Sequence, residues 1–151
     1  MPGDARRRRA HGAVGLAGAA VLLVGGCDVL NTDKTPERVK DGTAELDLTV
    51  TGRPTPGTLA TAEHVLARLK ARDAEGLAGL AAKDGGSDED ARRWVTRWGG
   101  AAQHPVTADF LPGEKEASVD VRFTGERTTL TLRLKDNGYD DRFRVLLRED
   151  R

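Results

Sequence analysis

The stretch Ala117-Ser-Val-Asp-Val-Arg-Phe-Thr124 decides the fold, because its apolar and polar residues alternate strictly. A period of two places one set of side chains on each face of a β-strand. The same pattern returns over 130–134, after the turn residues Gly125-Glu126, and Asp136-Asn137-Gly138 is typical of a hairpin with a two-residue turn. Two further strands are expected, over 106–111 and 143–147. The C-terminal third therefore predicts an antiparallel sheet of about four strands with one apolar face.

Three helices are expected before this sheet. The first starts at Thr58 or Thr61 and places its apolar side chains at helical spacing, with His64 on the opposite, solvent-facing side. Asp73 is expected to cap a short second helix over 74–82, and Ser87 to start a third together with Asp90. Helices are the elements available to cover the apolar face of the sheet. The sequence thus predicts an α+β domain of two layers, with N-terminal helices packed on a curved antiparallel sheet.

The third helix carries both tryptophans of the chain, Trp94 and Trp98, on one stripe with Ala91 and Val95. Exposed tryptophans one helical turn apart could stack on a sugar or a base. The chain has only 4% aromatic residues, however, and the stripe is apolar, so core packing is the favoured interpretation. Arg92, Arg93 and Arg97 on the same helix form a modest basic edge, interpreted as a solvated face rather than a phosphate clamp. If an internal pocket exists, its expected lining is Trp94, Trp98, Val119, Val121, Phe123 and Leu132.

The N-terminal end predicts an export signal. Arg6–Arg9 precede an uncharged run of 14 residues over 13–26. A membrane-spanning helix needs about 20 apolar residues, whereas the apolar part of a signal peptide needs about 7–15. Residues 1–26 have a net charge of +3 and the rest of the chain −3. General secretion is preferred to the twin-arginine route, because Ala10-His11-Gly12 replaces the bulky apolar residues that usually follow the arginine pair.

Val24-Gly25-Gly26-Cys27 resembles the lipobox of bacterial lipoproteins. The resemblance implies cleavage between Gly26 and Cys27, a diacylglyceryl group on the Cys27 thiol, and location on the extracytoplasmic face of the cell membrane. Two acyl chains give stable anchoring, whereas one binds a membrane only marginally. The alternative is a buried cysteine that happens to follow an apolar helix. The excess of Arg over Lys, with abundant Ala and Gly, indicates a GC-rich genome such as that of an actinobacterium.

Three segments are therefore expected: a signal peptide over 1–26, lipidated Cys27 with a polar tether over 27–57, and an α+β domain over 58–151. The tether contains one possible strand, over 44–50. That strand either joins an edge of the later sheet or pairs with a partner by strand addition.

The order of elements over about 58–148 resembles the nuclear-transport-factor-2-like, SnoaL-like cone: a long helix, a short helix opened by Asp73, a third helix and a meander of strands. Short actinobacterial lipoproteins often carry such domains. Enzymes of that family work inside the cone with inward Asp, His, Tyr or Arg side chains, and no such set can be matched here. The strand over 44–50 departs from the simplest version of the family.

Composition and motifs limit the function classes. Balanced charge argues against a nucleic-acid partner, and the absence of phosphate-binding glycine motifs leaves a nucleotide site unsupported. No metal or cofactor is expected, since the chain has one Cys and, after residue 26, two His. The favoured function is a non-enzymatic binding or accessory module for an envelope protein partner, its small-molecule ligand unknown. Alternatives are a carrier of an apolar small molecule and a cone-type hydrolase or isomerase, for which His104 and Asp109 are the best candidates.

Overall fold

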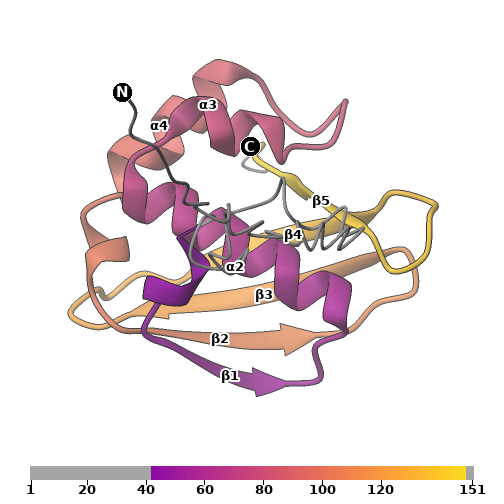
Figure 1. The fold of residues 1–151 in the computed structure, drawn as a ribbon, viewed down its shortest axis with the longest axis horizontal. Coiled ribbons are helices and arrows are strands. Elements are labelled where there is room, and N and C mark those ends of the chain that lie inside the picture. Colours follow the sequence, from indigo (N-terminus) through magenta and orange to yellow (C-terminus); the bar gives the residue numbers. More distant parts are fainter. Residues whose placement is uncertain (1–41, 149–151) are drawn as a thin grey trace, which may run out of the picture. The chain divides into compact units, whose positions relative to one another are not determined.

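The computed structural model describes residues 42–148, so the expected signal peptide, Cys27 and most of the tether lie outside the described residues. Figure 1 shows the described elements in chain order. They are the 3-10 helix η2 (Thr43–Glu45), β1 (Leu48–Gly52), α2 (Pro56–Ala71), α3 (Ala74–Gly79), α4 (Asp88–Trp98), the 3-10 helix η3 (Ala101–Gln103), β2 (Val106–Leu111), β3 (Glu116–Phe123), β4 (Leu130–Asp136) and β5 (Phe143–Leu146). The expectation of an α+β domain is confirmed.

The five strands form one mixed sheet in the order β1-β2-β3-β4-β5. Strands β2 to β5 form the expected antiparallel meander, whereas β1 runs parallel to β2, with Leu48 opposite Val106. Parallel neighbours need a long crossover connection, and the three helices supply it. The sheet therefore has five strands instead of about four, and the possible strand of the tether is its edge strand.

Strand β1 occupies 48–52 rather than the expected 44–50, because residues 43–45 form the turn of η2. The strand ends at Gly52, which has a left-handed φ of 80° and lies against the backbone of Phe110. A Cβ at this position would overlap the Phe110 carbonyl oxygen, so the close approach of β1 to β2 requires glycine here.

Helix α2 begins earlier than Thr58, because Thr55 caps it. The Thr55 hydroxyl accepts the Thr58 backbone N–H at 3.2 Å, and Pro56 occupies the first helical position, where its missing N–H costs nothing. Asp73 caps α3 as expected, accepting the Gly76 N–H at 2.8 Å. The capping box of Ser87 and Asp90 at the start of α4 is also confirmed.

Helix α3 ends at Gly79, three residues before the expected boundary, because the chain then joins the edge of β5. The Ala82 N–H donates to the Val145 carbonyl at 2.9 Å, and the Val145 N–H donates to the Leu80 carbonyl at 3.1 Å. Ala81 and Val145 form an isolated parallel bridge. These hydrogen bonds compete with continuation of the helix and extend the sheet beyond β5.

The hairpin between β4 and β5 is wider than the Asn-Gly signal predicts. The last strand pair is Asp136 opposite Phe143, so six residues connect the strands instead of two. Gly138 does adopt a left-handed φ of 76°, and its N–H donates to the Asp136 carboxylate at 2.8 Å. The Asn137 N–H donates to the Arg142 carbonyl at 2.8 Å, which closes the wider loop. The reversal between β3 and β4 is also longer than expected, covering 124–129.

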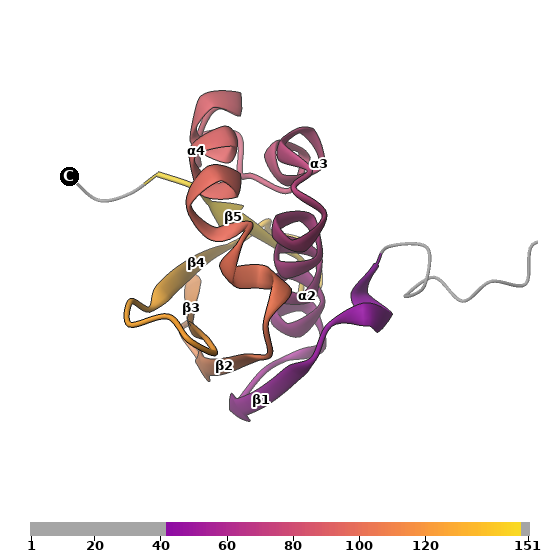
Figure 2. The same cartoon turned by 90° about the vertical axis from the view of Figure 1, so that its left-hand side faces the viewer.

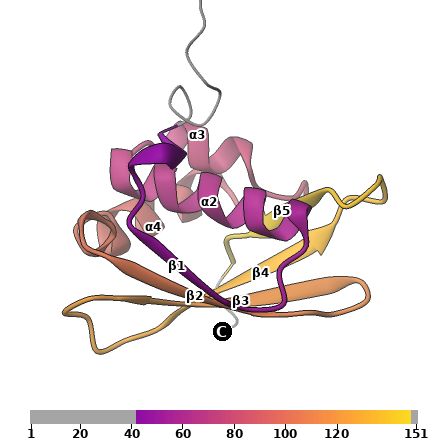
Figure 3. The ribbon, with the colours of Figure 1, turned by 60° about the horizontal axis from the view of Figure 1, so that its bottom comes forward.

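The helices lie on one side of the sheet and cover its apolar face (Figures 2 and 3). Trp94 and Trp98 have exposed fractions of 4% and 5%, and the Trp98 ring lies 5.8 Å from that of Phe123. The prediction that the tryptophans are core residues is confirmed. The helices bury the apolar side chains of β3, β4 and β5, which are Ala117, Val119, Val121, Phe123, Leu130, Leu132, Leu134 and Val145.

Candidate functional site

The residues expected to line an internal pocket lie together in the packed core. All six belong to one hydrophobic cluster, and each has an exposed fraction of 5% or less. They are the helix residues Trp94 and Trp98 and the sheet residues Val119, Val121, Phe123 and Leu132. The two tryptophans also border surface depressions formed by the described residues. The expected processing and lipidation residues, Gly26 and Cys27, lie outside the described part of the chain.

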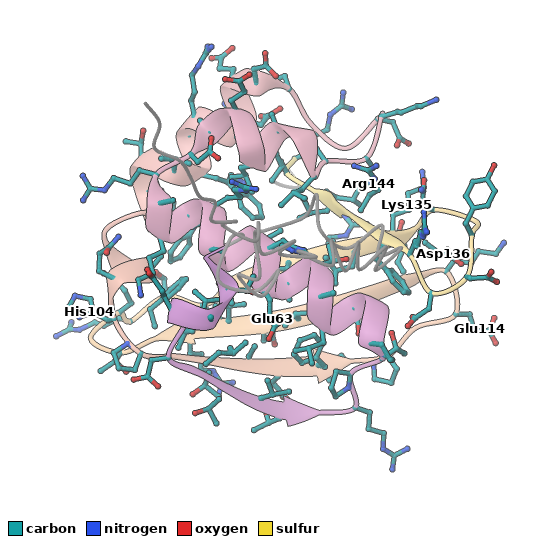
Figure 4. All side chains as sticks on the ribbon, viewed as in Figure 1. Glu63, His104, Glu114, Lys135, Asp136 and Arg144 are labelled. Carbon is teal, nitrogen blue, oxygen red and sulfur yellow. The ribbon has the colours of Figure 1, made fainter. Side chains whose placement is uncertain are left out.

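The candidate acid–base residues do not form a site. His104 is exposed in the loop that enters β2, as expected, and is labelled at the edge of the molecule in Figure 4. Asp109 is half-buried on β2 and accepts a hydrogen bond from the Thr51 hydroxyl at 3.0 Å. His64 was expected to face solvent but is half-buried, beside a depression near the β4–β5 loop.

A depression of about 310 Å³ lies between α4 and the start of β4, and we call it the α4–β4 depression. Strand β5 pairs only with the later part of β4, from Arg133 to Asp136. The first residues of β4 therefore extend past the paired part of β5 toward α4. The lining residues are Trp94, Arg97, Trp98, Thr129, Leu130, Thr131, Arg133, Leu146 and Arg148.

Among residues 42–148, three arginines and no acidic side chains line the α4–β4 depression. Arg97 lies over the Trp98 ring, with its guanidinium carbon 4.9 Å from the ring centroid. Arg133 forms an ion pair with Glu116 at 3.0 Å. Arg133 and Arg148 also line a neighbouring depression that contains Glu116 and Asp84. Glu116 thus balances part of the charge of Arg133 from outside the depression, whose described lining contains arginines and no carboxylate.

Both tryptophans present an unusual polar feature at this place. The indole Nε1 atoms of Trp94 and Trp98 are buried and make no hydrogen bond among the described residues. A buried donor that lacks an acceptor costs about 1–3 kcal/mol, so most such donors in proteins are paired. The two unpaired donors belong to side chains that line the depression, and such donors ordinarily have an acceptor.

A second depression, of about 440 Å³, shares Trp94 and Arg97 with the first. Its lining adds Arg92 and Arg93 together with Glu89. Arg93 is held in an ion pair by Asp90, one helical turn away. The basic edge predicted on the third helix is exposed, as expected of a solvated face, and its arginines also border two depressions.

Two surface carboxylates have shifted pKa values, and neither lies in the α4–β4 depression. A hydrogen bond from the Lys135 ammonium, 2.9 Å away, lowers the pKa of Asp84. Hydrogen bonds from the backbone N–H and hydroxyl of Ser87 lower the pKa of Asp90. Both shifts stabilise the ionised form and are explained by local structural contacts.

Metal ligation and membrane crossing can be assessed for residues 42–148. In this range, His, Cys, Asp and Glu residues form no group of three or more with the geometry of a metal site. None of the helices described has the length and apolar composition required to span a bilayer.

The contribution of Arg133 and Arg148 to this site was missed at the level of sequence. Alternation over 130–134 places Arg133 on the polar face of its strand, which is correct, but the pattern does not show that this end of β4 lies beside α4. The only signal was the spacing of Thr129, Thr131 and Arg133, which places hydrogen-bonding side chains on one face.

Comparison with protein-family models finds no match for this chain. Comparisons with curated proteins and with solved structures also find no match.

Proposed function

We propose that this protein is a lipoprotein of the extracytoplasmic membrane face, whose α+β domain is a non-enzymatic binding module in the cell envelope. The anchor is proposed on Val24–Cys27, where an aliphatic residue and two glycines precede the only cysteine of the chain. The binding role is proposed on one observation, the arginine-lined α4–β4 depression with its two unpaired indole donors. A ligand or envelope partner that presents an anionic group fits this lining.

The core favours binding at the surface over chemistry or carriage inside the domain. A carrier or a cone-type enzyme needs space between helices and sheet. The side chains at that place, Val119, Val121 and Leu132, are completely buried in the packed cluster. General acid–base catalysis also needs a titratable group in a cleft, and the inward face of β3 and β4 is apolar.

We further propose that the domain is a variant of the nuclear-transport-factor-2-like cone. A long helix, a short helix capped by Asp73, a third helix and a four-stranded meander support this assignment. The parallel edge strand β1 is the addition that distinguishes it from the simplest form of that family.

The anchor is tested by labelling cells with radioactive palmitate. The wild-type chain should be labelled and should sediment with membranes, whereas Cys27→Ser should lose the label. Asp28→Asn leaves the thiol in place and is the matched control, which should be labelled like the wild type. Equal labelling of wild type and Cys27→Ser would refute the anchor. Protection of the domain from protease added to intact, wall-free cells would refute the extracytoplasmic location.

A further inference from the structure

We propose that the α4–β4 depression binds a phosphate group, carried either by a soluble phosphate ester or by the headgroup of an anionic phospholipid. This inference deepens the proposed binding function and names its ligand class. The headgroup source also depends on the proposed location at a membrane surface, whereas the soluble source does not.

The lining of the depression carries positive charge. Arg97, Arg133 and Arg148 line it with guanidinium groups, which are cationic and offer planar, multiple N–H donors. Guanidinium groups form charge-assisted hydrogen bonds with phosphate oxygens that are stronger than neutral ones. Among residues 42–148 no carboxylate lines the depression itself, and Glu116, which forms an ion pair with Arg133, lies outside it. The depression is therefore chemically suited to an anion.

The three guanidinium groups come from separate parts of the chain. Arg97 comes from α4, Arg133 from β4, and Arg148 from the segment that follows β5. Donors on three separate elements approach a ligand from different directions. A tetrahedral phosphate accepts hydrogen bonds on several oxygens at once, whereas a planar carboxylate is satisfied by donors in one plane. The hydroxyls of Thr129 and Thr131 add neutral donors to the same wall.

The two indole N–H donors beside the depression are a feature that is independent of its charge. The Nε1 donors of Trp94 and Trp98 belong to side chains that are more than nine-tenths buried, and both lack an acceptor among the described residues. Arg97 lies over the Trp98 ring and is itself exposed, so it can move toward a ligand without disturbing the core. Both rings line the depression, so a ligand seated there contacts the side chains whose Nε1 donors lack an acceptor among the described residues.

The two tryptophans also provide the measurement, because they are the only ones in the chain. The experiment follows intrinsic fluorescence of the full-length chain carrying Cys27→Ser, which removes the proposed acylation site. One arm titrates inorganic phosphate and glycerol 1-phosphate at constant ionic strength, with chloride as the reference anion. The other arm compares vesicles of phosphatidylcholine alone with vesicles that contain equal parts of phosphatidylglycerol.

The variants remove charge in matched amounts. Arg97→Gln with Arg148→Gln removes two charges from the depression. The control, Arg53→Gln with Arg142→Gln, removes two charges from the segments after β1 and between β4 and β5. All four side chains belong to exposed residues, so both double variants should fold, which circular dichroism verifies. We expect the depression variant to raise the dissociation constant about 100-fold, tenfold for each lost guanidinium contact, and the control to change it less than threefold.

Each outcome decides between sources or overturns the proposal. A saturable response to soluble phosphate that the depression variant loses supports a soluble ester. A response confined to phosphatidylglycerol vesicles, lost in the same variant, supports a lipid headgroup. No response in either arm, or equal weakening by both double variants, overturns the phosphate site. The palmitate experiment reads a different part of the chain, so its failure would leave the soluble arm intact.

Discussion

Asp141 holds the β4–β5 loop against the first turn of α2, although 84 residues separate it from Gly57. One oxygen of its carboxylate accepts the Thr55 hydroxyl, and the other accepts the Gly57 N–H at 2.7 Å. These groups lie at the N-terminus of the helix, where free N–H donors and the helix dipole favour an acceptor of negative charge. Asp141 also adopts a left-handed backbone with φ of 50°. Replacement of this residue therefore tests two contributions at once.

The size of each contribution follows from its type. Loss of the capping acceptor costs about 1 kcal/mol, and loss of the charge at the helix terminus costs about 0.5 kcal/mol. Alanine is less tolerant than aspartate of a positive φ, while glycine has no such penalty in the folded state. Asp141→Ala should thus lower the free energy of unfolding by about 2–3 kcal/mol, and Asp141→Gly by about 1 kcal/mol less than that. Asp141→Asn keeps an acceptor and tolerates the left-handed region, so it should cost less than about 1 kcal/mol.

Urea unfolding, followed by tryptophan fluorescence, measures these differences. The neighbouring Asp140→Ala removes a carboxylate from the same loop, and Asp140 is exposed with no capping contact to α2, so this control should stay within about 0.5 kcal/mol of the wild type. The expected order of destabilisation is Asn, then Gly, then Ala. Equal values for Asp141→Ala and Asp141→Gly would refute the backbone part of the reasoning. A cost below about 0.5 kcal/mol for Asp141→Ala would refute the capping part.

Four further predictions use the same unfolding assay. Gly57→Ala should prevent stable folding, because its Cβ would overlap the Asp141 carbonyl oxygen, whereas Gly79→Ala, with open space around it, should be neutral or stabilising. Leu132→Ala should cost about 2–5 kcal/mol, since this side chain is completely buried; a cost below 1 kcal/mol would mean that the core is not packed there. Asp120→Asn should stabilise the domain by a few tenths of a kcal/mol at pH 7, because Asp120 lies directly opposite Asp109 in the sheet, and a loss of stability would contradict this. The lowered pKa of Asp90 contributes stability that is complete above its ordinary value of 3.8 and is lost as the pH falls below it. The free energy of unfolding of Asp90→Asn should therefore fall less steeply with decreasing pH than that of the wild type. An equal pH dependence of the two proteins would argue against the capping box.

Local signals in the sequence were sufficient for most elements of this fold. The alternation over 117–124 and the caps at Asp73 and Ser87 depend on contacts within a few residues, and the structure has them. Burial of Trp94 and Trp98 could also be predicted, because an apolar stripe must find a partner in a chain with so few aromatics. The predictions that the structure confirms most closely are those of elements that depend on contacts between residues near in sequence.

Features that depend on distant contacts could not be predicted in the same way. The parallel pairing of β1, the early end of α3 and the wide β4–β5 loop are set by Phe110, Val145 and the first turn of α2, respectively. Alternation indicates which face of a strand is apolar, but it is silent on which strand lies beside it. For the same reason, the sequence could place Arg97 on a helix and Arg133 on a strand without indicating that both line one depression.

The tryptophans connect the core to the candidate site, and this connection determines how the site can be studied. Their rings fill the space between α4 and the sheet, so substituting either one removes core packing as well as an Nε1 donor. A Trp98→Ala variant that lost binding would therefore show nothing about the ligand. The arginines differ, because Arg97 and Arg148 are exposed. Arg97 is carried by α4, and Arg148 follows buried Leu147 after the end of β5. Positioning of Arg97 on a helix favours a preformed geometry at that side of the depression. A phosphate site is therefore distinguished from a structural role if substitution of these arginines weakens binding and leaves the free energy of unfolding unchanged.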